Sequence, residues 1–377
     1  MNKVIIFILA IALIFGAGFW YRSYRVSAVK EKIYVAIEGE AKIAVIDAAT
    51  KKVIRNIDLS VEHDGGLLSF APHNVQVSPD QKSVWVTANA GKHQEHSSYL
   101  FNRASAHGEE EEGAAEADQV IIIDPLADKI IEWIPIARSI HLAHVVLTPD
   151  TRFAYVTAQE EGAVYKINTD NHAVKRIEMP LKSEPHGLRI SPDGLTAYIA
   201  MLGGKSLGVI DLRTDILSEI PLGGQAVQTG VTPDGKYAVA SLYDVKKLAV
   251  YNTADRTVSF ISLPESSRGP IQMYPTPDSR FIYLADQGYY FNQPTGEWVY
   301  KIELASAKVV KEIKAGSAPH GVVVSHDGNF VYVTNLLSGD VSVIDTAMDE
   351  EVGRIKVGKT PNGISIWTKN KYFFINI

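Results

Sequence analysis

Short runs in which apolar and polar residues alternate recur along most of the chain. Gly187-Leu188-Arg189-Ile190 is one such run, and a period of two is typical of half-buried β-strands. Many of these runs stop at a Ser/Thr-Pro-Asp sequence and a second apolar run follows. Proline presets φ and aspartate bonds its own backbone, so each such sequence is a turn signal. The pattern predicts an all-β chain built from hairpins.

The turn sequence divides the chain into repeats. Six copies begin at Ser78, Thr148, Ser191, Thr232, Thr276 and Ser325, and His326 replaces proline in the last copy. After each hairpin comes a third strand such as Gly208-Val209-Ile210-Asp211, and then a fourth such as residues 351–357. Four strands per repeat is typical of the blades of a β-propeller.

The two ends of the repeat region complement each other. Residues 32–37, 42–47 and 52–59 have the pattern of strands two, three and four without a first strand, whereas residues 363–367 supply a seventh first strand. Pairing the two ends completes seven blades and removes two open sheet edges. We therefore predict a seven-bladed β-propeller over residues 33–368, closed by its N- and C-terminal strands, with residues 369–377 as a C-terminal tail.

An uncharged apolar run from Val4 to Trp20 precedes the repeats. As a helix it reaches roughly 25 Å, near the lower limit for crossing a bilayer. We expect residues 1–32 to form an N-terminal hydrophobic helix and linker that anchor the protein in a membrane, with the propeller extracytoplasmic, in the periplasm or at the cell surface. Cleavage after Ala28 is the alternative and would make the protein secreted. The basic residues after the run argue for the opposite orientation.

The repeat register places one polar side chain of each blade at the same rim of the central channel, near the start of the innermost strand. These residues are His73, His144, His186, Gln228, Gln272, His320 and Asn362. We predict that they line the channel mouth and contact a small ligand or a partner protein there.

Two insertions fall in the loop between the second and third strands, which is on the face of the rim. Residues 89–118 carry His93, His96 and His107 before a run of four glutamates, and residues 286–298 are rich in aromatic side chains, among them Tyr290 and Trp298. Functional groups often lie on loops held by a rigid scaffold. We expect the insertions to fold over the mouth.

Imidazole is the principal metal ligand available in this chain, because it has no cysteine and therefore no thiolate, disulfide or attached c-type haem. Neutral histidine suits copper, zinc, iron and nickel. A metal centre would draw on His73, His144, His186 and His320, with His93, His96 and His107 beside them. The alternative is that the rim imidazoles bond backbone groups or water and that the insertion is a solvated loop. Convergence of the imidazole nitrogens distinguishes the two.

Charge and motifs exclude other classes of protein. The formal net charge of -6 gives no reason to expect nucleic acid as a partner. No glycine-rich phosphate loop and no His-Glu-x-x-His sequence occurs. The chain length of 377 residues fits one tethered ring, which we expect to be monomeric.

Second strands such as Tyr332-Val333-Thr334-Asn335 and Tyr155-Val156-Thr157-Ala158 resemble the repeats of the YVTN family of β-propellers. The resemblance covers about residues 33–368. It implies an exported or surface propeller of undefined role, and related propellers carry haem d1, copper clusters or lactonase sites. We expect a binding or scaffold module; the alternative is a copper- or haem d1-dependent redox protein that uses the rim histidines. A lactonase-like site lacks an acid/base pair in this sequence.

Overall fold

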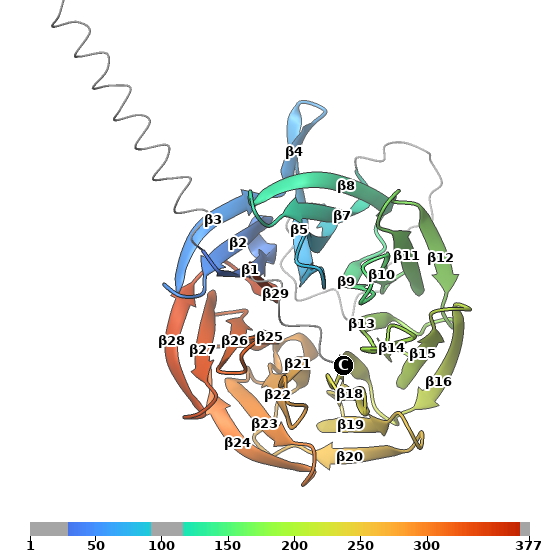
Figure 1. The fold of residues 1–377 in the computed structure, drawn as a ribbon, viewed down its shortest axis with the longest axis vertical. Coiled ribbons are helices and arrows are strands. Elements are labelled where there is room, and N and C mark those ends of the chain that lie inside the picture. Colours follow the sequence, from blue (N-terminus) through green and yellow to red (C-terminus); the bar gives the residue numbers. More distant parts are fainter. Residues whose placement is uncertain (1–28, 92–115, 370–377) are drawn as a thin grey trace, which may run out of the picture.

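The computed structural model describes residues 29–91 and 116–369, and in this part of the chain seven β-sheets form a ring around a central channel (Figure 1). Six sheets have four strands and one has five. The predicted all-β, seven-bladed propeller is confirmed.

Each blade is numbered here in chain order, with its strands given from the channel outward. Blade 1 consists of β5 (Gly66–Val77), β6 (Val84–Ala90), β7 (Asp118–Asp124) and β8 (Lys129–Ala137), with β4 (Ser60–His63) paired to the projecting end of β5. Blade 2 consists of β9 (Leu142–Leu147), β10 (Phe153–Ala158), β11 (Ala163–Asn168) and β12 (Val174–Glu178). Blade 3 consists of β13 (Pro185–Ile190), β14 (Thr196–Met201), β15 (Ser206–Asp211) and β16 (Ile216–Pro221).

Blade 4 consists of β17 (Ala226–Val231), β18 (Tyr237–Leu242), β19 (Lys247–Asn252) and β20 (Val258–Ser262), and blade 5 of β21 (Pro270–Pro275), β22 (Phe281–Asp286), β23 (Trp298–Glu303) and β24 (Lys308–Lys314). Blade 6 consists of β25 (Pro319–Val324), β26 (Phe330–Asn335), β27 (Asp340–Asp345) and β28 (Glu350–Lys356). Blade 7 consists of β29 (Pro361–Thr368), β1 (Glu31–Ile37), β2 (Lys42–Asp47) and β3 (Lys52–Asp58). Two short 3-10 helices, η1 (Glu38–Glu40) and η4 (Tyr289–Phe291), lie between second and third strands.

The ring closes as the sequence predicts, because β29 and β1 pair in antiparallel fashion, with Ile33 opposite Ile366. At this seam the ammonium group of Lys32, which is 2% exposed, donates to the carboxylate of Asp128 in blade 1 at 2.8 and 2.9 Å. The hydroxyl of Tyr34 donates to the same carboxylate at 2.6 Å. A buried ion pair therefore joins the closing blade to its neighbour.

The predicted N-terminal helix lies outside the described residues. Among the residues that the structure describes, no helix has both the length and the apolar character needed to cross a membrane.

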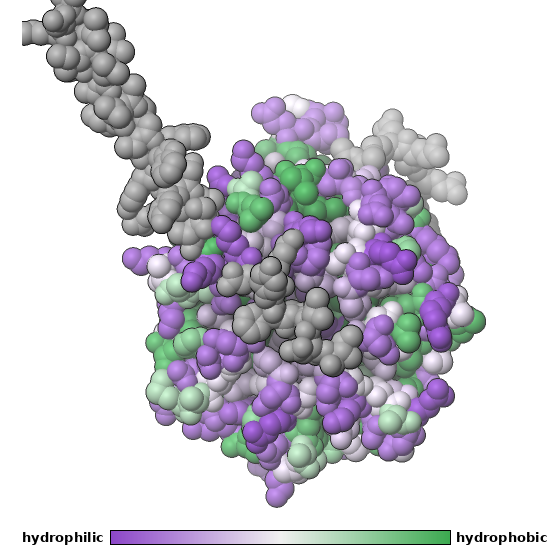
Figure 2. Space-filling view, viewed as in Figure 1, coloured by the Kyte–Doolittle hydropathy of each residue, from purple (hydrophilic) through white to green (hydrophobic). Residues whose placement is uncertain are grey.

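The aspartates of the repeated turns act as the sequence suggests. In all six copies the Ser or Thr hydroxyl donates to the aspartate two residues later, as from Ser78 to Asp80 at 2.7 Å and from Ser191 to Asp193 at 2.5 Å. Each of these six turns is thereby satisfied locally. We call the side of the ring that carries them the turn face. Figure 2 shows one side of the ring, where hydrophilic and hydrophobic residues are interspersed around the outer part.

The hydroxyl of the second strand explains the Thr in the Tyr-Val-Thr repeat. Thr157 Oγ1 accepts the backbone N–H of His144 at 2.9 Å and donates to the carbonyl oxygen of His186, in the next blade, at 2.7 Å. Thr87, Ser241 and Thr334 make the same pair of bonds in their blades. One side chain therefore holds an innermost strand and its neighbouring blade together at the rim.

A β-bulge or other register shift interrupts the pairing of the innermost and second strands in all seven blades. In blade 1 it falls between Pro72 and Asn74, next to His73. Bulges redirect side chains, so these irregularities turn the rim residues toward the channel. We call this side of the ring the mouth.

Candidate metal centre at the channel mouth

The structure places all seven rim side chains in the mouth, and all are buried. Their exposed fractions run from 0% to 7%, for His73, His144, His186, Gln228, Gln272, His320 and Asn362. They do not form one uniform ring, because only part of the set comes together.

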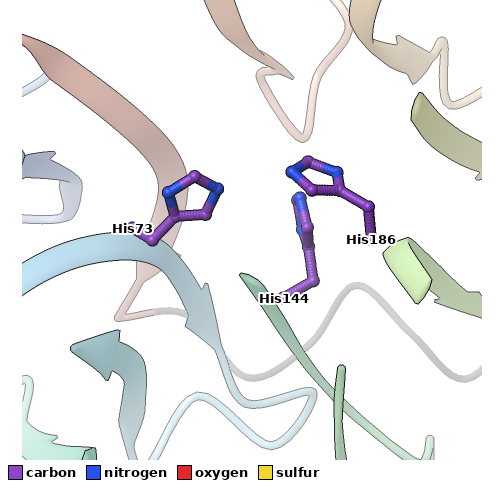
Figure 3. Close-up of side chains that lie close together, drawn as sticks. All are labelled: His73, His144 and His186. Carbon is purple, nitrogen blue, oxygen red and sulfur yellow. The ribbon is translucent and has the colours of Figure 1, made fainter. Parts of the chain in front are cut away.

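Three imidazoles converge. One ligand nitrogen from each of His73, His144 and His186 lies within 4.8 Å of the other two. Their ring centroids are 5.2 to 6.2 Å apart, and Figure 3 shows nitrogens of the three rings turned toward a common space. Zn–N bonds of about 2.0–2.1 Å imply ligand nitrogens roughly 3.4 Å apart in a tetrahedral site. Small ring movements would therefore bring the three nitrogens to one ion.

Hydrogen bonds to the far side of two rings leave their inner nitrogens free. His186 Nδ1 lies 2.9 Å from the carbonyl oxygen of Val227, which is an acceptor only, so Nδ1 carries the proton and Nε2 the lone pair. His73 Nδ1 lies 3.3 Å from the carboxylate of Glu38 and 3.2 Å from the side-chain amide nitrogen of Asn362, so the tautomer of this ring depends on which of the two it bonds. A proton donated to Glu38 leaves the lone pair on Nε2, which has no partner in the described part of the chain. Metal-bound histidines are usually oriented by such acceptors.

The third ring has the same tautomer. Gln228 accepts a backbone N–H through its Oε1, so its amide nitrogen donates to His144 Nε2 at 3.3 Å. His144 Nε2 therefore carries a lone pair, and an ion would replace the amide as its partner.

His320 differs from these three histidines. The amide nitrogen of Gln287 donates to His320 Nδ1 at 2.8 Å, so the proton of the neutral ring is on Nε2. A protonated nitrogen is a donor and cannot coordinate a metal ion. The structure therefore separates His320, a donor at Nε2, from His144 and His186, which are acceptors at Nε2, although the sequence grouped all four.

Burial favours the neutral form of two of the three rings, His144 and His186. It is the largest cause that lowers the pKa of His186 to about 3 and the pKa of His144 well below its usual value, and neighbouring histidines add to both shifts. Protonation would remove the lone pair, so the neutral state is the one that binds metal.

Sequence reasoning missed two residues of this centre. Glu38, 1% exposed, comes from η1, and its carboxylate also accepts the amide of Asn362 at 2.8 Å. His141 packs its ring against that of His73, with 5.1 Å between centroids. Glu38 directly follows a second strand, and the loops between second and third strands lie at the mouth. The repeat register could therefore have placed Glu38 at the mouth. His141 precedes the aligned rim position, so the register does not place it there.

The second insertion covers the mouth in part. Tyr290 packs edge-on against His320 at 5.5 Å between ring centroids, and Phe291 stacks on Tyr243 at 3.6 Å. Trp298 instead begins β23 and packs against the core between blades 4 and 5. Tyr290 and Phe291 line a cavity of about 40 Å³ together with four histidines, which are His73, His141, His186 and His320. His93, His96 and His107 lie outside the described residues.

The residues fit a metal ion. Three imidazoles without a thiolate suit copper, zinc and neighbouring transition metals. The cavity of about 40 Å³ has room for an ion and a small ligand.

The closed ring defines a protein of the seven-bladed β-propeller class. Residues 280–372 match the YNCE-like beta-propeller family model, so the resemblance to propeller repeat proteins is confirmed.

Similar proteins include the hydrazine synthase subunit beta of Kuenenia stuttgartiensis, which is 23% identical over 81% of this chain and 60% of its own length. This chain therefore spans less than two thirds of that relative. The solved hydrazine synthase of the same organism has a TM-score of 0.62 and 20% identity, over 78% of this chain and 88% of that one.

Two further solved structures share the fold. Virginiamycin B lyase from Staphylococcus aureus has a TM-score of 0.61 and 15% identity, over 80% of this chain and 95% of that one. The dihydro-heme d1 dehydrogenase NirN has a TM-score of 0.57 and 16% identity, over 89% of this chain and 74% of that one. At these identities the likeness establishes the architecture, and function has to be argued from the site.

Proposed function

We propose that this protein is a binding module that holds one transition-metal ion, zinc or copper, in the mouth of its channel. His73, His144 and His186 are the ligands, each through Nε2. The observation that carries the proposal is their convergence in a buried mouth, with ligand nitrogens within 4.8 Å of one another.

The surroundings of the three rings support this function. Glu38 and the Val227 carbonyl accept from the outer nitrogens of His73 and His186, an arrangement that orients metal-bound imidazoles. The carboxylate of Glu38 also places negative charge beside the cation. An ion held by three protein ligands keeps a position for a further ligand, as in zinc sites that bind small molecules.

Metal analysis of protein purified without a histidine tag, followed by calorimetric titration of the apoprotein with Zn²⁺ and Cu²⁺, tests the proposal. We expect one ion per chain. His186→Ala should weaken binding more than about 100-fold, because even changes in groups that only orient the ligands cost about 10–100-fold.

Two controls accompany that titration. His326→Gln changes a histidine of the turn face and should leave the affinity unaltered. A triple variant with asparagine at His93, His96 and His107 should retain the tight ion, which separates the mouth from the insertion. Unchanged binding in His186→Ala, or its loss in the triple variant, would contradict the proposal.

We also propose that the apolar run Val4–Trp20 tethers the propeller to a membrane, with the ring on the extracytoplasmic side. The uncharged length of the run supports this. Strand β1 starts on the turn face, so a tether at that end would leave the mouth directed away from the membrane. Fractionation and protease accessibility of intact cells test it: the full chain should pellet with membranes, whereas a soluble product starting after Ala28 would indicate cleavage.

A further inference from the structure

We infer that the metal centre takes a small anion of carboxylate type as its remaining ligand, and that His320 donates a hydrogen bond to it. The inference rests on the proposed function, because the ion supplies one of the two contacts.

His320 presents an unused donor to the cavity. Gln287 fixes the proton on His320 Nε2, this nitrogen has no hydrogen-bond partner in the described part of the chain, and the side chain is 1% exposed. A buried donor without a partner costs about 1–3 kcal/mol. His320 lines the cavity together with His73 and His186. A ligand that accepts hydrogen bonds and also coordinates the ion would satisfy it.

Charge selects the class of ligand. A divalent ion with three neutral imidazoles carries +2, the Glu38 carboxylate beside His73 contributes -1, and the positive charge of the Arg189 guanidinium also acts on His144. A net charge in a buried site is costly, and the centre with its ion remains positive. The favoured ligand is therefore an anion rather than a neutral molecule.

Size and lining restrict it further. The cavity of about 40 Å³ admits a molecule of a few heavy atoms, and Val227, Ile271 and Phe291 make part of its wall apolar. Formate and acetate meet these limits. Of the described residues that line the cavity, Glu160 carries a carboxylate, and it is exposed to solvent, where water screens its charge.

Cobalt-substituted protein provides the test, since the visible absorption of Co²⁺ responds to a change of ligand. We expect sodium acetate to alter the spectrum with saturation and acetamide, its neutral counterpart, to bind at least about 10-fold more weakly. His320→Leu should weaken acetate at least about 10-fold while Co²⁺ affinity stays the same. His326→Gln is the matched histidine control.

A charge variant tests the second argument. Glu38→Gln should weaken Co²⁺ but strengthen acetate binding to the loaded protein, because the centre then carries a larger positive charge. If Co²⁺ does not bind to the wild-type protein, the proposed function fails and this inference with it. If Co²⁺ binds but acetate has no effect, or acts equally on His320→Leu, only this inference fails. A response that appears only in Glu160→Gln would show that Glu160 is the remaining ligand and would also overturn it.

Discussion

The two faces of the ring use polar residues in opposite ways. On the turn face, Asp80 and Asp234 each accept hydrogen bonds from a neighbouring hydroxyl and a backbone N–H, and a lysine lies close to each carboxylate. Burial by itself would raise the pKa of both carboxyl groups, but the hydrogen bonds and the lysine together lower it. At the mouth, burial is the largest cause that raises the pKa of Asp118 to about 6, and it also raises the pKa of Asp286.

The difference shows that the repeated sequence motif stabilises the fold on the turn face, whereas the side chains at the mouth vary from blade to blade. The turn face repeats one local motif that satisfies its own polar groups. The mouth combines different side chains from seven blades, and some of their nitrogens, such as His73 Nε2, have no partner in the described part of the chain. Polar groups that the fold itself does not satisfy are available for a ligand.

The largest effect on stability is expected at the seam on the turn face. Lys32→Met leaves the buried carboxylate of Asp128 without its cation, which costs about 3–5 kcal/mol for a buried pair. Lys236→Met, from an exposed pair on the same face, should cost less than about 1 kcal/mol. Chemical unfolding measures both, and equal losses would show that the seam is not special.

The pH dependence of stability should have opposite signs on the two faces. The native pKa of Asp118, about 6, exceeds the usual value of 3.8, so its contribution to stability is present at low pH and lost as pH rises through 6. The loss is about 3 kcal/mol at about 1.4 kcal/mol per pKa unit. Unfolding of wild type and Asp118→Asn at pH 4 and pH 7 measures it.

Asp80 supplies the matched comparison from the turn face. Its native pKa is lowered, so its stabilisation is present above the usual pKa and lost as pH falls below it. The stability difference between wild type and Asp80→Asn should therefore grow with rising pH, whereas for Asp118→Asn it should shrink. The same trend in both variants would refute the contrast between the faces.

Glu38 should matter more for metal than for folding. Glu38→Gln removes the charge that orients His73, and we expect about 10–100-fold weaker Zn²⁺ binding. Glu40→Gln, in the same short helix, is the control, because the Glu40 carboxylate accepts a hydrogen bond from the backbone N–H of Lys359 and does not contact a histidine of the centre. Calorimetry that finds equal affinities in the two variants would remove Glu38 from the centre.

The smallest effect concerns the hydroxyls that join the blades. Thr157→Val removes bonds to His144 and His186 and should cost about 1–2 kcal/mol of stability. Metal affinity should fall as well, because both partners are proposed metal ligands. Ser241→Ala removes the equivalent bonds to Gln228 and Ile271 and should cost similar stability without altering metal affinity. An equal loss of metal affinity in Thr157→Val and Ser241→Ala would indicate that either change makes the whole mouth less rigid.

Much of the architecture could be predicted because its causes are local and repeated. The Ser/Thr-Pro-Asp turns specify hairpins within a few residues, and counting strands at both ends was enough to predict the pairing of β1 with β29. The insertions could not be treated this way, since their loops have no repeat to follow. Trp298, expected over the mouth, starts a strand instead, whereas Tyr290 lies beside His320.

The sequence by itself determined the ring, its closure and which side chains reach the mouth, because strand period and repeat register are short-range properties. Only the tertiary structure decided which of those side chains act together. The proton positions on His73, His186 and His320 depend on Glu38, Val227 and Gln287, which come from other blades or loops. Donor and acceptor roles are set by neighbours in space, and a linear pattern does not contain them.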